Sequence, residues 1–217
     1  MRTLLRMFLV LLLLAGCGDD DPATTDAMVD GSSASDADAS AESDADASSE
    51  TDASGDGEIP EGSTIYYIVR HTERDPGADP PINAEGIVRA QALADRLENA
   101  GIDEIITTMF IRGQQSGQPL ADRLGQQITV APFMMTTWTA FAAEVSAWQQ
   151  QRETPGNTYL MIGHSGGYNT GLLTGLGATL NGTTGERYED LVIMVREPDG
   201  TVRVTEELYG GPSSLDP

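Results

Sequence analysis

Apolar residues in the second part of the chain form short runs that are typical of buried strands. Ser63 to Arg70 is rich in β-branched and aromatic residues and contains neither Gly nor Pro, so it predicts a first strand. Similar runs predict strands at residues 102–108, 128–130, 158–162, 191–196 and 202–208. The last two flank Pro198-Asp199-Gly200, a sequence that favours a tight turn, and we expect them to pair as a hairpin.

Between these predicted strands, apolar residues recur at the spacing that is typical of helices. The pattern predicts helices from a cap at Asn83 to about residue 100, over 113–124, over 137–152, and from a Gly-rich turn to about residue 176. In the first helix one face is expected to be buried, and it carries Ile87, Ala90, Ala94 and Leu97. Alternating strands and helices predict an α/β fold: a three-layer α/β/α sandwich with a mostly parallel central sheet and a C-terminal hairpin.

The start of the chain has the pattern of an export signal. Arg2 and Arg6 precede an apolar run from Met7 to Ala15. This run is too short for a membrane-spanning helix, which needs about 20 apolar residues. It ends in Leu14-Ala15-Gly16-Cys17, which resembles the bacterial lipobox, where the cysteine is acylated. We therefore interpret residues 1–17 as a lipoprotein signal peptide and Cys17 as a lipidation site; a stray or buried cysteine is the alternative.

The predicted location follows from this lipobox. Acyl chains on Cys17 would make the protein a membrane-anchored lipoprotein of the bacterial cell envelope. Gly18 stands where Asp usually signals retention in the inner membrane, which favours the outer membrane. Residues 18–58 contain 14 acidic and no basic side chains, so they are predicted to form an acidic, disordered tether. Residues 59–217 are left as one folded domain.

Charge excludes some classes of function for this domain. It contains 20 acidic residues, 10 arginines and no lysine. Nucleic-acid binding needs a basic surface that neutralises backbone phosphates, and the chain has none, so we predict no nucleic-acid partner. An anion site would have to be built from arginines, because arginine is the only basic residue type besides the two histidines.

Both histidines come directly after a predicted buried strand. His71 follows Arg70, and His164 lies between Gly163 and Ser165. Ligands of open α/β sheets bind at the carboxyl ends of the strands. Although the two histidines are 93 positions apart, parallel strands would bring them to the same edge. A lone histidine is usually structural, but the repeated placement favours a shared site.

These residues resemble motifs of the histidine phosphatase superfamily, which has the phosphoglycerate-mutase-like fold. Val69-Arg70-His71-Thr72-Glu73 is similar to the Arg-His-Gly motif, with Thr72 where Gly is commonest. The segment from Thr107 to Ser116, with Arg112, is similar to the helix start that carries the second arginine. Ile162-Gly163-His164-Ser165-Gly166 is similar to the second-histidine motif. The likeness covers residues 63 to about 180, in the family's order.

The resemblance implies a role for each residue. His71 would attack phosphorus and form a phosphohistidine, which water then hydrolyses. Arg70, Arg112 and His164 would bind the phosphoryl oxygens together with His71. The resemblance implies neither a metal nor a cofactor. Ser165 stands where the acid-phosphatase branch has Asp, which disfavours that branch.

The general acid is less clearly marked. In many members of the resembling family a carboxylate between the second arginine and the second histidine protonates the leaving oxygen. In this chain that interval contains three candidates for the general acid: Asp122, Glu144 and Glu153. Glu144 is the best placed of the three, although a surface role would suit it equally. Glu73, two residues after His71, is an alternative.

The leading hypothesis is a phosphomonoester hydrolase that acts on a small-molecule or peptide-borne phosphate ester. The rival is a catalytically weak or inactive lipoprotein that binds a phosphate ligand. A metal hydrolase is disfavoured, because no clustered ligand set accompanies the histidines. Substrate choice is expected to lie in the loops 75–82 and 131–138. Because these loops are short, we expect an open pocket and hydrolysis rather than mutase activity.

Overall fold

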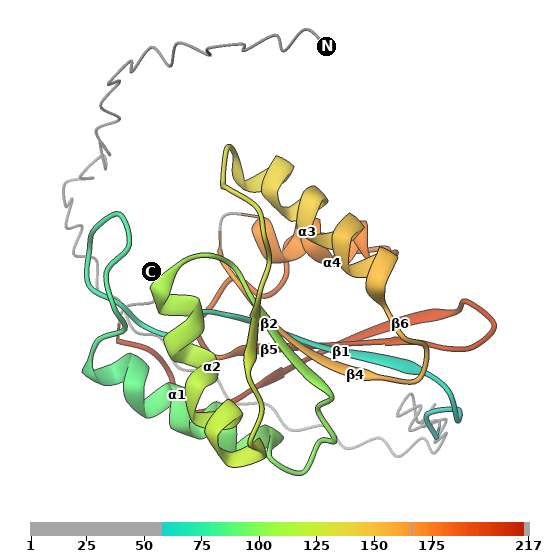
Figure 1. The fold of residues 1–217 in the computed structure, drawn as a ribbon, viewed down its shortest axis with the longest axis horizontal. Coiled ribbons are helices and arrows are strands. Elements are labelled where there is room, and N and C mark those ends of the chain that lie inside the picture. The colour runs from blue at the N-terminus through green and yellow to red at the C-terminus, as the bar shows by residue number, and fades with distance from the viewer. Residues whose placement is uncertain (1–57, 166, 215–217) are drawn as a thin grey trace, which may run out of the picture. The chain divides into compact units, whose positions relative to one another are not determined.

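A computed structural model describes residues 58–165 and 167–214. The predicted signal peptide, the lipidation site Cys17 and nearly all of the predicted tether lie outside these described residues. The strands are β1 (Thr64–Arg70), β2 (Glu104–Thr107), β3 (Ile128–Val130), β4 (Thr158–Gly163), β5 (Asp190–Arg196) and β6 (Val202–Leu208). The helices are α1 (Ala84–Leu97), α2 (Ile111–Leu124), α3 (Trp138–Arg152) and α4 (Tyr168–Gly175). Figure 1 shows their arrangement around the sheet.

The six strands form one mixed sheet in the order β3-β2-β4-β1-β5-β6. The first four run parallel to one another, whereas β5 is antiparallel to β1 and β6 is antiparallel to β5. The turn between β5 and β6 is closed by two backbone bonds: the amide of Gly200 donates to the carbonyl of Glu197, and the amide of Glu197 donates to that of Thr201. The predicted α/β fold with a C-terminal hairpin is confirmed.

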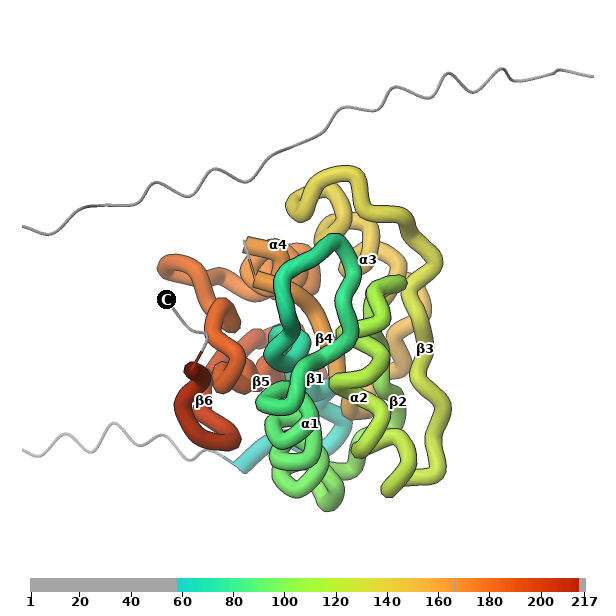
Figure 2. Tube along the Cα trace, turned by 90° about the vertical axis from the view of Figure 1, so that its left-hand side faces the viewer, coloured from blue at the N-terminus to red at the C-terminus, as the bar shows by residue number. Residues whose placement is uncertain are grey.

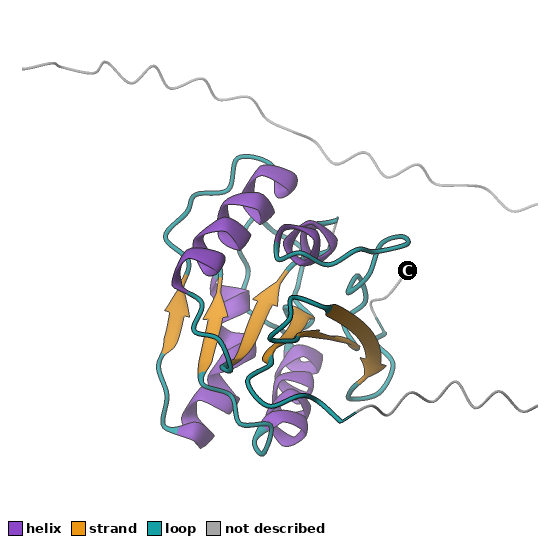
Figure 3. Ribbon diagram, turned by 90° about the vertical axis from the view of Figure 1, so that its right-hand side faces the viewer, coloured by secondary structure: helices purple, strands orange, loops and turns teal. Residues whose placement is uncertain are grey.

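Two separate apolar cores cover the two faces of the sheet. One contains Phe141 and Val145 of α3 and Leu172 of α4, packed against Tyr66 and Met161. The other is formed by α1 and α2 on the opposite face, where they pack against Val69 and other strand residues. Figure 3 shows the helices above and below the strands. The described domain is thus a three-layer sandwich, as predicted. None of its helices is long and apolar enough to cross a membrane.

Helix α1 buries a different stripe from the predicted one. Ala90, Ala94 and Leu97 are buried as expected, but Ile87 is 53% exposed, so its predicted burial is wrong. The place on the buried face is taken by Arg89, which is only 5% exposed. A charged side chain is not expected in a core unless a partner neutralises it. That partner is Glu73, whose Oε1 accepts from Nε of Arg89 at 2.6 Å.

The other element boundaries agree to within a few residues. Asn83 caps α1 by accepting from the amide of Gly86, and Thr137 caps α3 in the same way. Helix α1 ends at Leu97, three residues before its predicted end. Helix α2 begins at Ile111, two residues earlier than predicted, so Arg112 lies within its first turn.

Candidate active site

The two histidines lie next to each other at the carboxyl ends of adjacent strands. Strands β1 and β4 pair in parallel with Arg70 opposite Gly163, so the next residue of each strand is a histidine at the same level. The amide of His71 donates to the carbonyl of Gly163 at 3.0 Å and extends this pairing. The two imidazole centroids are 5.4 Å apart. The sheet register thus forms the histidine pair directly.

The ring of His71 is buried and held in one tautomer. Its Nδ1 donates to the carbonyl oxygen of Thr72 at 2.9 Å, which leaves the lone pair of the neutral ring on Nε2. Burial lowers the pKa of His71 to about 3, and the positive charges of Arg112 and Arg70 add to this, while the bond to Thr72 opposes it. An imidazole with a free lone pair on Nε2 is the form that a nucleophile requires.

His164 lies in an aromatic enclosure. Its Nε2 is 2.8 Å from Oγ1 of Thr108, and its ring centroid lies 4.7 Å from Trp138 and 5.1 Å from both Phe110 and Tyr168. Burial moves the pKa of His164 well below its ordinary value, and the neighbouring His71 and Arg112 act in the same direction. Nδ1 is buried without a hydrogen-bond partner within the described residues. This ring therefore has an unused polar atom beside His71.

Arg112, in the first turn of α2, lies close enough to both histidines to lower the pKa of each. Its side chain is only 4% exposed, and the guanidinium carbon lies 4.2 Å from the centroid of Phe110. Nη1 donates to the carbonyl of Ala78 at 3.3 Å and to Oδ1 of Asp79 at 3.2 Å. Nε is buried without a partner in the part of the chain that the structure describes. This group is a cation with donor capacity left for an anion.

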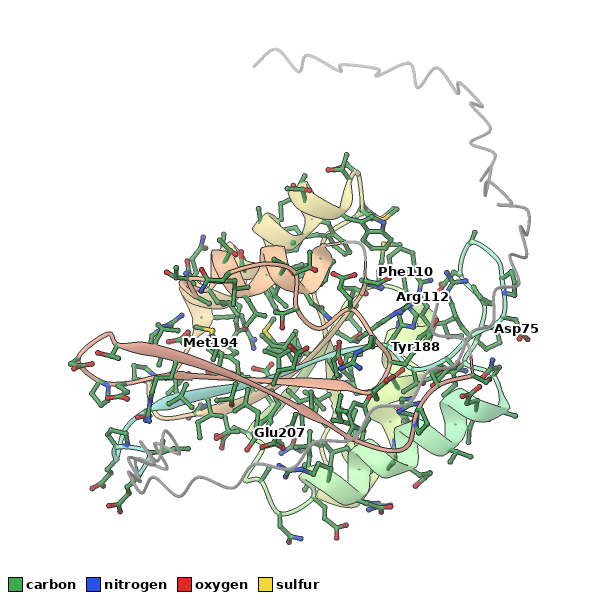
Figure 4. All side chains as sticks on the ribbon, turned by 180° about the vertical axis from the view of Figure 1, so that it is seen from behind. Asp75, Phe110, Arg112, Tyr188, Met194 and Glu207 are labelled. Atoms are coloured by element: carbon green, nitrogen blue, oxygen red, sulfur yellow. The ribbon has the colours of Figure 1, made fainter. Side chains whose placement is uncertain are left out.

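Arg70, at the end of β1, lies against a tyrosine. Its guanidinium carbon is 3.7 Å from the centroid of Tyr188, and Nη1 donates to the carbonyl of Glu186 at 2.8 Å. The ring of Tyr188 is in turn 6.0 Å from that of His71. Figure 4 shows Tyr188 close to Arg112 and Phe110, although Tyr188 comes from the segment between α4 and β5 and the other two from the start of α2. Two arginines and two histidines thus form one cluster, in which the charges of both arginines act on both imidazoles.

Thr72 fits at the position where the resembling motif usually has Gly. Its side chain is fully buried, and Oγ1 lies 3.1 Å from Oγ of Ser116, which also accepts from the Thr72 amide at 2.8 Å. No residue other than Gly has a positive φ within the described residues, so Thr72 needs no glycine-like backbone. Ser116 of α2 thus compensates for the change and links the His71 loop to the Arg112 helix.

The structure does not bring the carboxylates that were considered as general acids together with the histidines. Glu144 is exposed on α3, and no contact between described residues joins it to His71 or His164. Glu73 is buried, but its carboxylate points to Arg89 of α1. Asp122 is exposed and accepts from Gln118, and Glu153 binds Arg196 and the hydroxyl of Tyr66. No cluster of three or more His, Cys, Asp or Glu in the described residues could hold a metal ion.

Sequence reasoning missed three residues that contact the site: Thr108, Tyr188 and Asp79. Tyr188 and Asp79 reach the site from connections between elements, and no motif marks them, whereas Thr108 lies inside the segment that resembles the second-arginine motif. For Asp79 there was an indirect signal. An arginine in the first turn of a helix is unfavourable unless an anion is near, and the structure supplies the carboxylate of Asp79 at that place. The anion beside Arg112 in this structure is thus a carboxylate of the chain itself.

Comparisons with known proteins agree with the motifs. Residues 66–160 match the family model described as Histidine phosphatase superfamily (branch 1). No curated protein sequence matches the chain. The matched segment includes His71 and Arg112 and ends before His164.

Solved structures of low sequence identity resemble the chain. The protein histidine phosphatase SixA complexed with tungstate is 17% identical, with a TM-score of 0.49, over 66% of this chain and 96% of that one. The putative phosphohistidine phosphatase SixA from Agrobacterium tumefaciens is 18% identical, with a TM-score of 0.49, over 68% and 98%. A phosphoserine phosphatase from Entamoeba histolytica, in complex with 3-phosphoglyceric acid, is 14% identical, with a TM-score of 0.48, over 68% and 98%.

Proposed function

We propose that the protein hydrolyses phosphomonoesters through a phosphohistidine on His71. The observation that carries the proposal is the cluster of a neutral, tautomer-fixed imidazole, a second histidine and two arginines whose charges act on both rings. A nucleophile beside a concentrated positive charge suits attack on an anionic phosphoryl group. The superfamily match over residues 66–160 supports phosphatase chemistry in general.

In the first step Nε2 of His71 attacks phosphorus in line with the ester oxygen. The N–P bond forms as the P–O bond breaks, and the leaving oxygen departs with the bonding electrons and takes up a proton. Arg70 and Arg112 hold the phosphoryl oxygens, and their attraction counts most where negative charge grows in the transition state. Nδ1 of His71 keeps its proton and donates a hydrogen bond to the Thr72 carbonyl, which stabilises the positive charge that develops on the ring.

In the second step water attacks the phosphohistidine and restores the enzyme. The P–N bond breaks, its electron pair returns to Nε2, and inorganic phosphate leaves with the oxygen of water. His164 lies beside the phosphoryl position, where its buried Nδ1 has no partner among the described residues. A protonated Nδ1 would donate to a phosphoryl oxygen in both steps. Access of water to the phosphohistidine favours hydrolysis over return of the phosphoryl group, so we propose a phosphatase rather than a mutase.

Glu144 remains the proposed proton donor to the leaving oxygen, and one comparison tests it. An aryl leaving group needs little protonation, whereas an alkyl leaving group needs a proton. If Glu144 donates it, Glu144→Gln lowers kcat/KM for an alkyl phosphate far more than for an aryl phosphate. If, for each ester, the Glu144→Gln protein has the same kcat/KM as the unsubstituted protein, Glu144 is excluded and water is left as the proton donor. This outcome would leave the role of His71 intact.

The decisive experiment on the proposed function is the His71→Ala substitution. We expect turnover of 4-nitrophenyl phosphate to fall to background, because no covalent step can occur without the imidazole. The fold should persist, which circular dichroism would check. Acid quench of the unsubstituted enzyme during turnover should trap acid-labile phosphate on His71. Full activity of the His71→Ala protein would refute the mechanism.

We also propose that the enzyme is exported and anchored in the bacterial envelope through lipid on Cys17. The support is the order of basic residues, apolar run and lipobox-like sequence in residues 1–17. The acidic residues 18–58 would then act as a tether between the anchor and the catalytic domain.

A further inference from the structure

Exposed apolar side chains gather at the end of the sheet where the histidines lie. Nine large hydrophobic residues are exposed in the described part of the chain, and five of them follow or end β2 and β3. These five are Met109, Ile111, Val130, Met134 and Met135. The connections after β2 and β3 are neighbours, because Thr107 pairs with Val130 and the amide of Ala131 donates to the carbonyl of Thr107. Apolar clusters of this kind on a surface often mark a binding site.

This apolar region reaches the histidine cluster through Phe110 and Trp138. We define the apolar rim as Met109, Phe110, Ile111, Met134, Met135 and Trp138. Phe110 and Trp138 are half-buried, and their ring centroids are 6.0 Å apart, one from each connection. Phe110 also lies against the guanidinium of Arg112, and both rings lie against His164. A phosphoryl group bound by Arg112 and His164 would place the organic part of the ester near the apolar rim.

Positive charge outside the pocket is largely neutralised. Seven of the ten arginines of the domain form ion pairs with carboxylates away from the histidines: Arg89, Arg96, Arg123, Arg152, Arg187, Arg196 and Arg203. The charges that act on the two imidazoles are those of Arg112, Arg70 and Arg74. Nη1 of Arg74 is already bonded to the carbonyls of Asp75 and Gly77. A substrate with a second anionic group therefore meets little free positive charge beyond the phosphoryl site.

We propose that the apolar rim binds the organic part of the substrate, so that the substrate class is phosphomonoesters of apolar alcohols or phenols. This inference rests on the proposed function, because it assumes that the phosphoryl group is held between Arg112 and His164. Highly charged esters such as phosphoglycerates are disfavoured twice, by the rim and by the net acidic domain.

Binding of alkylphosphonates of increasing length tests the rim without requiring turnover. Phosphonates keep the anionic head but cannot be hydrolysed. We expect calorimetry on the purified protein to give a Kd that falls about two- to fourfold per added methylene from ethylphosphonate to hexylphosphonate. Inorganic phosphate, measured in the same way, gives the affinity of the head group alone. Hydrolysis of ethyl to hexyl phosphate, whose leaving groups are chemically similar, is measured in parallel.

Variants connect the trend to the rim. The double substitution Met134→Ser/Met135→Ser should flatten the dependence of Kd on chain length. Ile87→Ser is the matched control, because Ile87 is an equally exposed apolar residue on α1, and it should keep the full dependence. A Kd that does not change with chain length, or tighter binding of 3-phosphoglycerate than of hexylphosphonate, would overturn the inference. Chain-length-dependent binding without hydrolysis would instead overturn the proposed function alone.

A second inference rests on the carboxylate of Asp79, which lies on the loop between β1 and α1. Oδ1 accepts from the amide of Ile111 at 3.1 Å and from Nη1 of Arg112 at 3.2 Å, and the carbonyl of Ala78 accepts from the same Nη1. Figure 2 shows this loop rising beside α2. The contacts thus hold one nitrogen of the guanidinium, while the buried Nε has no partner among the described residues.

We infer that Asp79 is a positioning residue for Arg112. By fixing Nη1 it directs the remaining donors of the planar guanidinium to the phosphoryl oxygens, and this orientation matters because the fork binds oxygens in a fixed geometry. The inference rests on the proposed role of Arg112. This role of Asp79 differs from that of a helix cap, because a cap would stabilise α2 without affecting phosphate binding.

A double-mutant cycle separates the two roles. In the unsubstituted background Asp79→Ala should weaken orthovanadate binding and lower kcat/KM about tenfold, and Asp79→Asn should recover part of the loss. In the Arg112→Ala background Asp79→Ala should change both quantities less than twofold. Asp75→Ala, an exposed change on the same loop, is the control. Equal losses in both backgrounds, or tighter vanadate binding by Asp79→Ala, would contradict the inference; vanadate binding tests it even if the enzyme does not turn over.

Discussion

At the scale of single residues, His71 and His164 are neutral because they are buried among positive charges. Burial is the largest cause of the lowered pKa of each, and Arg112 and Arg70 act in the same direction. Either imidazole would gain a proton more readily in the unfolded chain, where the ordinary value is about 6.5. An anionic ligand between the arginines would reduce this difference. This arrangement suits the phosphoryl dianion of the proposed substrate.

This linkage predicts lower stability in mild acid. Between pH 6.5 and about 3 the unfolded chain binds more protons at His71 than the folded protein does, so the free energy of unfolding falls as the pH falls. The loss should reach up to about 1.4 kcal/mol per pH unit for each histidine. Urea denaturation at pH 7.5 and 5 measures it. Carboxylates also contribute to the acid slope, so the readout is the difference from a His71→Asn/His164→Asn protein, and equal slopes for both would contradict the prediction.

The second prediction at this scale concerns Arg112. Replacing it with Ala should cost about 2 to 4 kcal/mol of transition-state stabilisation, which is typical for loss of one preorganised donor. Arg112→Lys should recover only part, because an ammonium cannot reproduce the planar fork. Steady-state kcat/KM for an aryl phosphate is the measurement. Arg123→Ala, at the other end of α2 and paired with Asp95, should keep its activity; the same loss in both proteins would point to helix damage instead.

At the scale of elements, α1 forms the support of the His71 loop. Gly86 of α1 lies so close to the loop that an added Cβ would meet the carbonyl oxygen of Glu73 at 2.2 Å. Arg89 of α1 also binds the loop, because its Nε donates to the carboxylate of Glu73. Its Nη1 donates to the carbonyl of Tyr209, the residue after β6. The loop after β1 is thus fixed by the helix that follows it and by the end of the chain's last strand.

We therefore predict that Gly86→Ala damages both stability and activity. The backbone of the loop cannot yield as a flexible side chain would, so the free energy of unfolding should fall by about 1 to 3 kcal/mol. Because Glu73 is two residues from His71, kcat should fall as well. Urea titration and 4-nitrophenyl phosphate assays measure the two effects. A Gly211→Ala protein is the control, since a Cβ there meets nothing within 4 Å, and indistinguishable behaviour of the two proteins would refute the contact.

The elements also explain what could be predicted from the sequence. Strand runs such as Ser63 to Arg70 are rich in β-branched and aromatic residues and contain no Gly or Pro, so the order of elements and the positions of both histidines were predictable. Burial of Arg89 was not, because it depends on Glu73 reaching it from another segment. Tyr188 and Asp79 approach the pocket from loops, whose conformation depends on tertiary contacts rather than on periodicity.

At the scale of the whole molecule, the proposed anchor and the catalytic domain are expected to be independent. A Cys17→Ser protein should be released from membranes, because no acyl chain can be attached. Its kcat should equal that of the unsubstituted enzyme, since the acidic residues 18–58 cannot join a packed core. Membrane fractionation with an activity assay on each fraction measures both. Retention of the Cys17→Ser protein in the membrane would contradict the lipobox assignment, and a changed kcat would contradict independence.

The pairing of β1 with β4 also bears on how the enzyme gains activity during folding. His71 and His164 become neighbours only when two strands separated by most of the domain have aligned in register. Pairing over such a sequence distance closes a long loop, which is slow compared with the formation of single helices. A nascent chain that has not yet released β4 from the ribosome holds one histidine and no partner for it. The proposed activity should therefore arrive late in folding, so that an activity assay reports the pairing of β1 with β4.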